Sequence, residues 1–104
     1  MVAPYNPPVK AEDFITAIFL SEAVNPTNFK LTPTIAAGDF QVSKDFGAFA
    51  NLTTIPAETP AGSGQVKITL SATEMTADNV TVRWIDQTAT KEWADGAVTI
   101  PTTA

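Results

Sequence analysis

The chain of 104 residues contains no cysteine and no histidine. Without cysteine it has neither a disulfide framework nor a thiol nucleophile, and without histidine it lacks the side chain that most often moves protons near neutral pH. The two missing residue types are also the commonest zinc ligands. The four serines have no histidine with which to build a Ser-His-Asp triad. We therefore expect a protein that is not an enzyme and that holds no cofactor or metal.

Clustered positive charge is also lacking. Eleven acidic residues against six basic ones give a net charge of −5. The basic residues stand singly along the chain, at Lys10, Lys30, Lys44, Lys67, Arg83 and Lys91. Neutralising a phosphate backbone requires a basic stripe, so the sequence argues against nucleic acid as a direct partner.

The sequence has no long apolar run. The longest apolar stretch, residues 14–20, includes Thr16 and falls far short of the roughly 20 residues that span a bilayer. The first ten residues, MVAPYNPPVK, contain no apolar segment of the kind found in signal peptides. We expect neither a membrane partner nor a cleaved leader.

What the chain does have is enough apolar material for one folded domain. Hydrophobic residues make up 44% of it and charged residues only 16%, which is far from the composition of disordered chains. A chain of this length buries roughly two-thirds of its unfolded surface, enough for a single core. We expect one domain over residues 14–100, preceded by an arm at 1–13 and followed by a short tail at 101–104.

The predicted arm is rich in proline. Proline fixes φ and pushes the preceding residue out of the helical region, so this segment is expected to be extended. Ten extended residues reach about 33 Å, which would let the arm lie across a neighbouring subunit. The alternative is a frayed terminus without a role. The residues predicted to contact a neighbour are Pro4, Tyr5, Pro7, Pro8 and Val9.

Short segments rich in β-branched and aromatic residues predict strands. Residues 14–20 read as a strand buried on both faces, and residues 40–43 with 48–52 as a hairpin. Clean alternation predicts strands at 65–70 and 80–86, with Val80, Val82 and Trp84 facing inward. A last strand is expected at 92–100, with a bend at Asp95-Gly96.

Two connecting segments have their own signatures. Residues 53–64 contain two prolines and two glycines, which predicts a loop or an edge segment that cannot pair on both sides. Ser71-Ala72-Thr73-Glu74 fits a capping box and predicts one helical turn, with Met75 tucked under the sheet. Six to eight short strands of this spacing predict an all-β fold, an antiparallel β-sandwich of the immunoglobulin-like (Ig-like) kind.

Acidic and aromatic side chains leave two alternatives to weigh. Carboxylates near turns could gather around a calcium ion, but no EF-hand loop is present, and the ordinary role of Asp is to fix turns. These carboxylates are Asp39, Asp45, Asp78, Asp86 and Asp95. Trp93 is either a core residue or part of an exposed platform for stacking on sugars, and the core is favoured.

Three segments carry a resemblance: PTIAAGDFQVSKDFGAFANLTTIP, VKITLSATEMTADNVTVRWID and KEWADGAVTI. They resemble a small Ig-like β-sandwich domain found in structural and fibre-associated proteins of tailed-bacteriophage virions. The resemblance covers about residues 31–100. It implies a hairpin over 39–52 and a signature turn containing Glu74, Met75 and Asp78. Phe46 stands where that pattern usually has a second glycine.

The resemblance implies a virion structural protein, made in the cytoplasm of the bacterial host and located in the phage particle. The leading hypothesis is a capsid decoration (cement) protein that contacts neighbouring subunits through its arm and sheet edges. Its expected partners are other virion proteins, such as the major capsid protein or tail and neck components, in a symmetric homo-oligomeric arrangement. The alternative is a tail, neck or fibre module that could bind host glycans.

Overall fold

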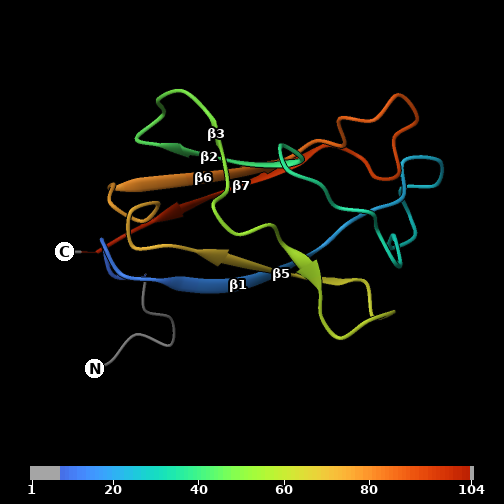
Figure 1. Ribbon diagram of the computed structural model, residues 1–104, viewed down its shortest axis with the longest axis horizontal. Coiled ribbons are helices and arrows are strands. Elements are labelled where there is room, and N and C mark those ends of the chain that lie inside the picture. The colour runs from blue at the N-terminus through green and yellow to red at the C-terminus, as the bar shows by residue number, and fades with distance from the viewer. Residues whose placement is uncertain (1–7, 104) are drawn as a thin grey trace.

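The computed structural model describes residues 8–103 and shows an all-β chain (Figure 1). Seven strands follow one another: β1 (Phe14–Phe19), β2 (Phe40–Lys44), β3 (Ala50–Asn51), β4 (Ala57–Glu58), β5 (Gln65–Leu70), β6 (Asn79–Trp84) and β7 (Gly96–Pro101). No helix occurs in this range, and therefore none that could cross a membrane.

The strands form two antiparallel sheets, consistent with a β-sandwich. One sheet has the order β1-β5-β4 and the other the order β3-β2-β6-β7. In Figure 1 the first sheet lies below the second. The core between them is apolar and contains, among others, Leu20, Phe40, Val42, Val66, Ile68, Leu70, Met75, Val80, Val82, Trp93 and Ile100.

The strands with the cleanest alternation match their predictions most closely. β5 has the predicted bounds, and its residues alternate between the core and the surface. β6 begins at Asn79 and ends at Trp84, where the prediction had 80–86. Val80 and Val82 are fully buried, while Trp84 packs against the core and is half-buried. Period-2 patterns are informative here because each strand has one face on the core.

The expectation that residues 14–20 are buried on both faces is wrong. β1 alternates, with Phe14, Thr16 and Ile18 half-buried on the inner face. Ile15 on the opposite face is 58% exposed, and Phe19 is also exposed. The reason is that residues 8–103 form only two sheets, so no third sheet covers the outer face of β1.

The predicted hairpin at residues 40–52 forms between β2 and β3, with Gln41 opposite Asn51. In its turn the Gly47 N–H donates to the Lys44 carbonyl at 3.0 Å. Asp45 and Phe46 both have positive φ, of 50° and 64°. Phe46 thus occupies the left-handed region that favours glycine, and its side chain is 74% exposed.

The capping box at residues 71–74 forms, but the expected helical turn does not extend into a helix. The Ser71 N–H donates to Glu74 Oε1 at 2.8 Å, and the Glu74 N–H donates to Ser71 Oγ at 3.2 Å. A single N–H(i) to O(i−4) bond follows, from Met75 to Ser71. The Met75 side chain is fully buried, as predicted. The turn ends there because the Ala77 N–H bonds to the Met75 carbonyl and the chain enters β6.

The last strand begins at Gly96 and not at residue 92. Trp93 instead pairs with Glu22 in an isolated antiparallel β-bridge, and the Ala94 N–H donates to the Ser21 carbonyl. These contacts hold the end of the β6–β7 connection against the chain that follows β1. The expected tail is part of the structure as far as Thr103, because Pro101 ends β7 and the Thr102 N–H donates to the Asp78 carbonyl.

Candidate interaction surface

The two sheets leave an open side between β1 and β7. Each of these strands stands at the edge of its own sheet, and neither has a strand partner on its outer edge in the range 8–103. Figure 1 shows them running in opposite directions, so that the start of β1 lies near the end of β7. Between them is a groove of about 280 Å³, lined by residues of 14–18 and 98–101. We call this the β1/β7 groove.

The lining of the β1/β7 groove is mostly apolar. Phe14 and Ile18 contribute from β1, and Val98 and Ile100 contribute from β7. Thr16 and Thr99 are the polar residues of the lining. An apolar groove flanked by two strand edges suits an extended peptide, because backbone groups can pair along the edge while alternate side chains fill the groove.

The described part of the predicted arm is bonded to the end of β7. The Lys10 N–H donates to the Thr103 carbonyl at 2.8 Å, and the Thr103 N–H donates to the Pro8 carbonyl at 2.9 Å. These bonds make a parallel bridge between Val9 and Thr103. Of the predicted contact residues, Pro8 is buried and Val9 is 42% exposed. Pro4, Tyr5 and Pro7 lie outside the described residues.

Hydrogen-bond alternation shows which backbone groups of β7 face the groove. The Thr103 N–H points to Pro8, and the Thr102 N–H points to the β6 side, at Asp78. Successive residues of a strand point their N–H groups to opposite edges. The N–H and carbonyl groups of Ala97 and Thr99 therefore point away from β6, toward the open edge. Pro101 offers only a carbonyl there.

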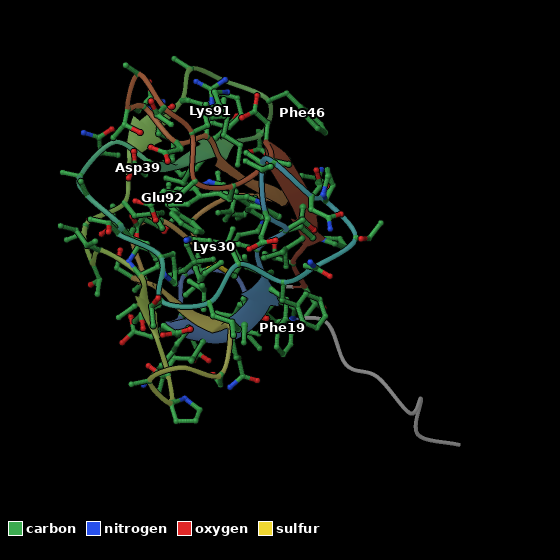
Figure 2. All side chains as sticks on the ribbon, turned by 90° about the vertical axis from the view of Figure 1, so that its right-hand side faces the viewer. Phe19, Lys30, Asp39, Phe46, Lys91 and Glu92 are labelled. Atoms are coloured by element: carbon green, nitrogen blue, oxygen red, sulfur yellow. The ribbon has the colours of Figure 1, made fainter. Side chains whose placement is uncertain are left out.

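A second apolar surface lies on the outer side of β1. The Phe19 and Phe29 rings pack against each other with centroids 4.7 Å apart and ring planes tilted by 31°, and both residues are exposed. Ile15 shares the outer face of β1, and Leu31 extends the surface from Phe29. Figure 2 shows Phe19 below Lys30 and Glu92, whose Nζ and Oε1 atoms are 3.9 Å apart. The sequence signal for this surface is the same apolar run that led to the two-sided burial prediction.

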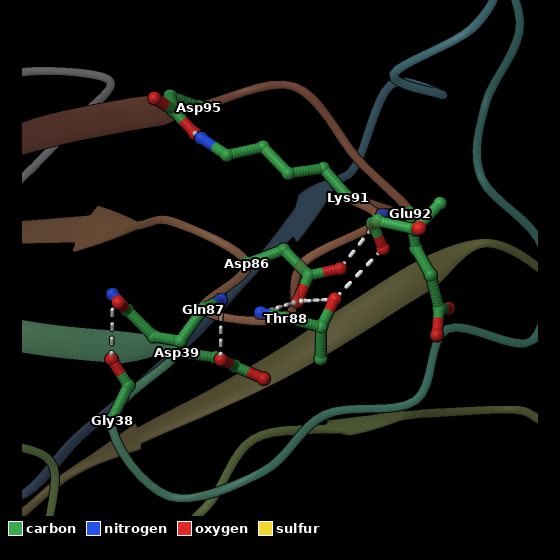
Figure 3. A network of polar contacts seen from close by, with 9 residues as sticks. Gly38, Asp39, Asp86, Gln87, Thr88, Lys91, Glu92 and Asp95 are labelled. Atoms are coloured by element: carbon green, nitrogen blue, oxygen red, sulfur yellow. Dashed lines mark hydrogen bonds and ion pairs between the residues drawn. The ribbon is translucent and has the colours of Figure 1, made fainter.

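Of the five carboxylates weighed as calcium ligands, Asp39, Asp45 and Asp86 accept hydrogen bonds from backbone amides. Asp78 and Asp95 form ion pairs with Lys10 and Lys91. Figure 3 shows Asp39 and Asp86 in the loops beside β2 and β6. Asp39 accepts from the Ala36 N–H at 2.9 Å and from the Gln87 N–H at 3.1 Å. Asp45 Oδ1 accepts from the backbone N–H groups of Asp78 and Asn79. Within residues 8–103 no three acidic side chains are grouped so that they could hold a metal ion.

Asp86 is the most heavily used of these carboxylates. It is 1% exposed. Oδ1 accepts from the Thr88 N–H at 3.0 Å and the Thr88 hydroxyl at 2.8 Å, and Oδ2 accepts from the Glu92 N–H at 2.7 Å. Burial raises the pKa of Asp86, but these three hydrogen bonds and the charge of Lys91 outweigh it and leave the pKa below its ordinary value. The carboxylate thus fixes the loop that delivers Trp93 to the core.

Trp93 is fully buried, which confirms the core interpretation over the exposed platform. Its ring lies 6.4 Å from that of Phe40. Its Nε1 is buried and has no hydrogen-bond partner among residues 8–103. Stacking on a sugar requires an exposed ring face, so Trp93 cannot serve as a glycan platform in this structure.

Comparison of the chain with protein families, with curated proteins and with solved structures finds no match. The surface features above therefore carry the functional argument. Sequence reasoning missed the β1/β7 groove, because it depends on how two strands about 80 positions apart are placed. The only sequence signal would have been an alternation of apolar and polar residues within 14–20. That alternation is absent, because the residues on both faces of β1 are mostly apolar.

Proposed function

We propose that this protein is a virion structural protein of a tailed bacteriophage, placed on the capsid as a decoration (cement) protein. It acts by contacting neighbouring subunits and has no catalytic role. The observation that carries the proposal is the open β1/β7 side, where two strand edges flank an apolar groove. An unpaired edge beside an apolar groove is a ready template for another chain.

Two further features support an assembly role. The strand orders β1-β5-β4 and β3-β2-β6-β7 fit an Ig-like sandwich in which the first strand of the fold is missing from the described chain. The resemblance of residues 31–100 to virion modules supports the same assignment. The turn implied by that resemblance has Glu74 buried, where it accepts hydrogen bonds from the N–H groups of Ser71 and Thr53.

The exposed pair Phe19 and Phe29 supplies a second contact surface. Exposed aromatic side chains with fixed geometry are typical anchors of protein interfaces. Because this surface lies on the outer face of β1 and the groove lies at its edge, a subunit can contact two neighbours at once.

A single backbone substitution tests the proposal. Thr99→Pro removes an N–H that points to the open edge, and an edge strand tolerates proline where the N–H faces outward. The variant should fold with the thermal midpoint nearly unchanged but should bind particles that lack this protein with much lower occupancy. Thr81→Val is the matched control, since it removes only the exposed hydroxyl contact with Thr99 Oγ1. Equal occupancy for wild type and Thr99→Pro would refute edge-mediated attachment.

The position within the particle needs a separate experiment. Electron microscopy of particles carrying a labelled copy of this protein distinguishes capsid decoration from a tail, neck or fibre location. A label confined to the tail or neck would overturn the capsid assignment and leave the structural role intact. The burial of Trp93 removes the residue on which a glycan-binding alternative depended.

A further inference from the structure

We propose that the β1/β7 groove is filled by residues 1–5 of a second copy of this chain, which enter as an added strand parallel to β7. The inference deepens the proposed function and rests on it for the presence of neighbouring copies. Three observations support it. Residues 1–7 lie outside the structure, Pro8 is held beside the end of β7, and the N–H and carbonyl groups on the outer edge of β7 have no strand partner among residues 8–103.

Residues 1–7 lie outside the structure, and they are long enough to run along β7, which contains six residues. Pro8 lies beside Thr103, just beyond the end of β7, at the same end of the groove as Phe14 and Pro101. Every copy thus holds the base of its arm at the mouth of its own groove. A neighbour packed against that end brings a second arm to the same place.

The chain's own arm fits the groove poorly. The bridge between Val9 and Thr103 fixes its register, so continued pairing would place residue 7 opposite Pro101 and Tyr5 opposite Thr99. At the first pair both required donors are missing, because residue 8 and residue 101 are prolines. The Ala97 carbonyl would also lack a donor, because residue 4 is a proline and has no N–H. This register would also turn the polar Asn6 toward Ile100.

A second copy is free of that register. Shifting its arm by one residue places Pro4 opposite Thr99 and residue 2 opposite Ala97. The N–H groups of Thr99 and Ala97 then donate to the carbonyls of residues 3 and 1, and their carbonyls accept from the N–H groups of residues 5 and 3. All four bonds have their donors. Pro4 points its ring nitrogen away from β7, where no donor is needed.

The same shift places the apolar side chains of the arm in the groove. Parallel neighbours opposite each other point to the same face, and Thr99 points outward while Val98 and Ile100 face the groove. Residue 3 then lies beside Val98, and Tyr5 lies beside Ile100. Met1, Ala3 and Tyr5 face inward, and the Tyr5 hydroxyl comes within reach of Thr16 across the groove.

The exchange also sets how close the copies must be. From Tyr5 to Pro8 the arm spans three residues, about 10 Å when extended. The base of the donor arm must therefore lie within that distance of Ile100 in the acceptor. Such a contact places the two arm bases side by side, so a two-fold pair can exchange arms reciprocally.

The absence of cysteine makes a clean disulfide test possible. Full-length Pro4→Cys and Thr99→Cys proteins, each with a single thiol, are mixed at high concentration under mild oxidation. A docked arm holds its thiol at an effective concentration in the millimolar range, so the mixed disulfide should exceed that of a control pair by about tenfold or more. The control pair is Pro4→Cys with Lys67→Cys, whose position is exposed on β5 away from the groove.

Separate measurements test the register of the arm and whether the arm comes from the same chain or from a second copy. Tyr5→Cys mixed with Thr99→Cys should give much less mixed disulfide than Pro4→Cys does, because residue 5 faces the groove in the proposed register. No preference over the Lys67→Cys control overturns the proposal. So does a Tyr5→Cys/Thr99→Cys double variant that closes its disulfide within one chain, since that result assigns the groove to the chain's own arm.

These outcomes are separable from those of the particle experiment. A mixed disulfide in a protein that does not attach to particles refutes the proposed function and leaves the arm exchange standing. Normal attachment to particles without the mixed disulfide refutes the arm exchange and leaves the proposed function standing.

Discussion

Replacing Asp86 by asparagine isolates the contribution of one buried carboxylate to the fold. The two side chains have nearly the same shape, but an amide offers one acceptor oxygen where the carboxylate offers two. In the least costly orientation the oxygen keeps the two bonds from Thr88, and the NH₂ group faces the Glu92 N–H. A charge-assisted hydrogen bond of 2.7 Å is then replaced by two donors facing each other.

The expected cost of Asp86→Asn at pH 7 is about 2 kcal/mol of unfolding free energy. Losing a hydrogen bond to a charged group costs about 1.5–3 kcal/mol, and relief of the buried charge offsets part of it. Urea unfolding followed by tryptophan fluorescence measures the difference, because Trp93 lies directly beyond the Asp86 loop and is fully buried. Thr90→Ala, at an exposed position of the same loop, is the control and should change stability by less than about 0.5 kcal/mol.

The same variant has a defined pH dependence. The folded pKa of Asp86 lies below its ordinary value of 3.8, so ionised Asp86 stabilises the folded state above that pH. This stabilisation is lost as the pH falls from about 4 through the folded pKa. Other carboxylates titrate equally in both proteins, so the gap between wild type and Asp86→Asn should narrow as the pH is lowered from 5 through that window. A gap that stays constant, or a variant as stable as wild type at pH 7, would refute the role assigned to this carboxylate.

Three further substitutions test the packing and the turns. Phe46→Gly should raise stability by about 0.5–1 kcal/mol, because it relieves a left-handed backbone at little cost in burial, whereas Phe46→Ala keeps the strain and should not stabilise; urea midpoints decide between them. Gly96→Ala should cost about 1–3 kcal/mol, since the new Cβ would lie 2.3 Å from Trp84 Nε1, and combining it with Trp84→Leu should cost less than the two changes added; a strictly additive thermal-unfolding result argues against the clash. Glu74→Gln should cost about 1–2 kcal/mol by chemical denaturation, because one of its two backbone donors loses its acceptor, and an unchanged midpoint would show that these bonds do not stabilise the turn.

Local patterns predicted those parts of the fold that local chemistry determines. β5 and β6 alternate with one face on the core, so their bounds were predicted to within two residues. The capping box was predicted from Ser71 and Glu74, because its bonds span only three residues. The segment 53–64 was expected as a loop or edge segment, and it contains the short edge strand β4.

Predictions failed where the outcome depends on distant parts of the chain. An apolar run such as residues 14–20 has the same sequence pattern whether a third layer covers it or not, so exposure of Ile15 could not be predicted. The start of β7 depends on Trp93 bridging to Glu22, some 70 residues away. The candidate groove depends on the placement of β1 against β7, which no local pattern specifies.

Pro101 limits how many hydrogen bonds the open edge of β7 can form with an added strand. A long unpaired edge beside apolar side chains invites pairing with any extended chain. On β7, alternation directs only Ala97, Thr99 and Pro101 to the open edge, and Pro101 has no N–H to give. Only two donors remain, too few for backbone pairing alone to hold an arbitrary peptide. An occupant must therefore also fit the groove between Ile18 and Ile100 with its side chains, so the affinity of the edge depends on the sequence of the strand that enters it.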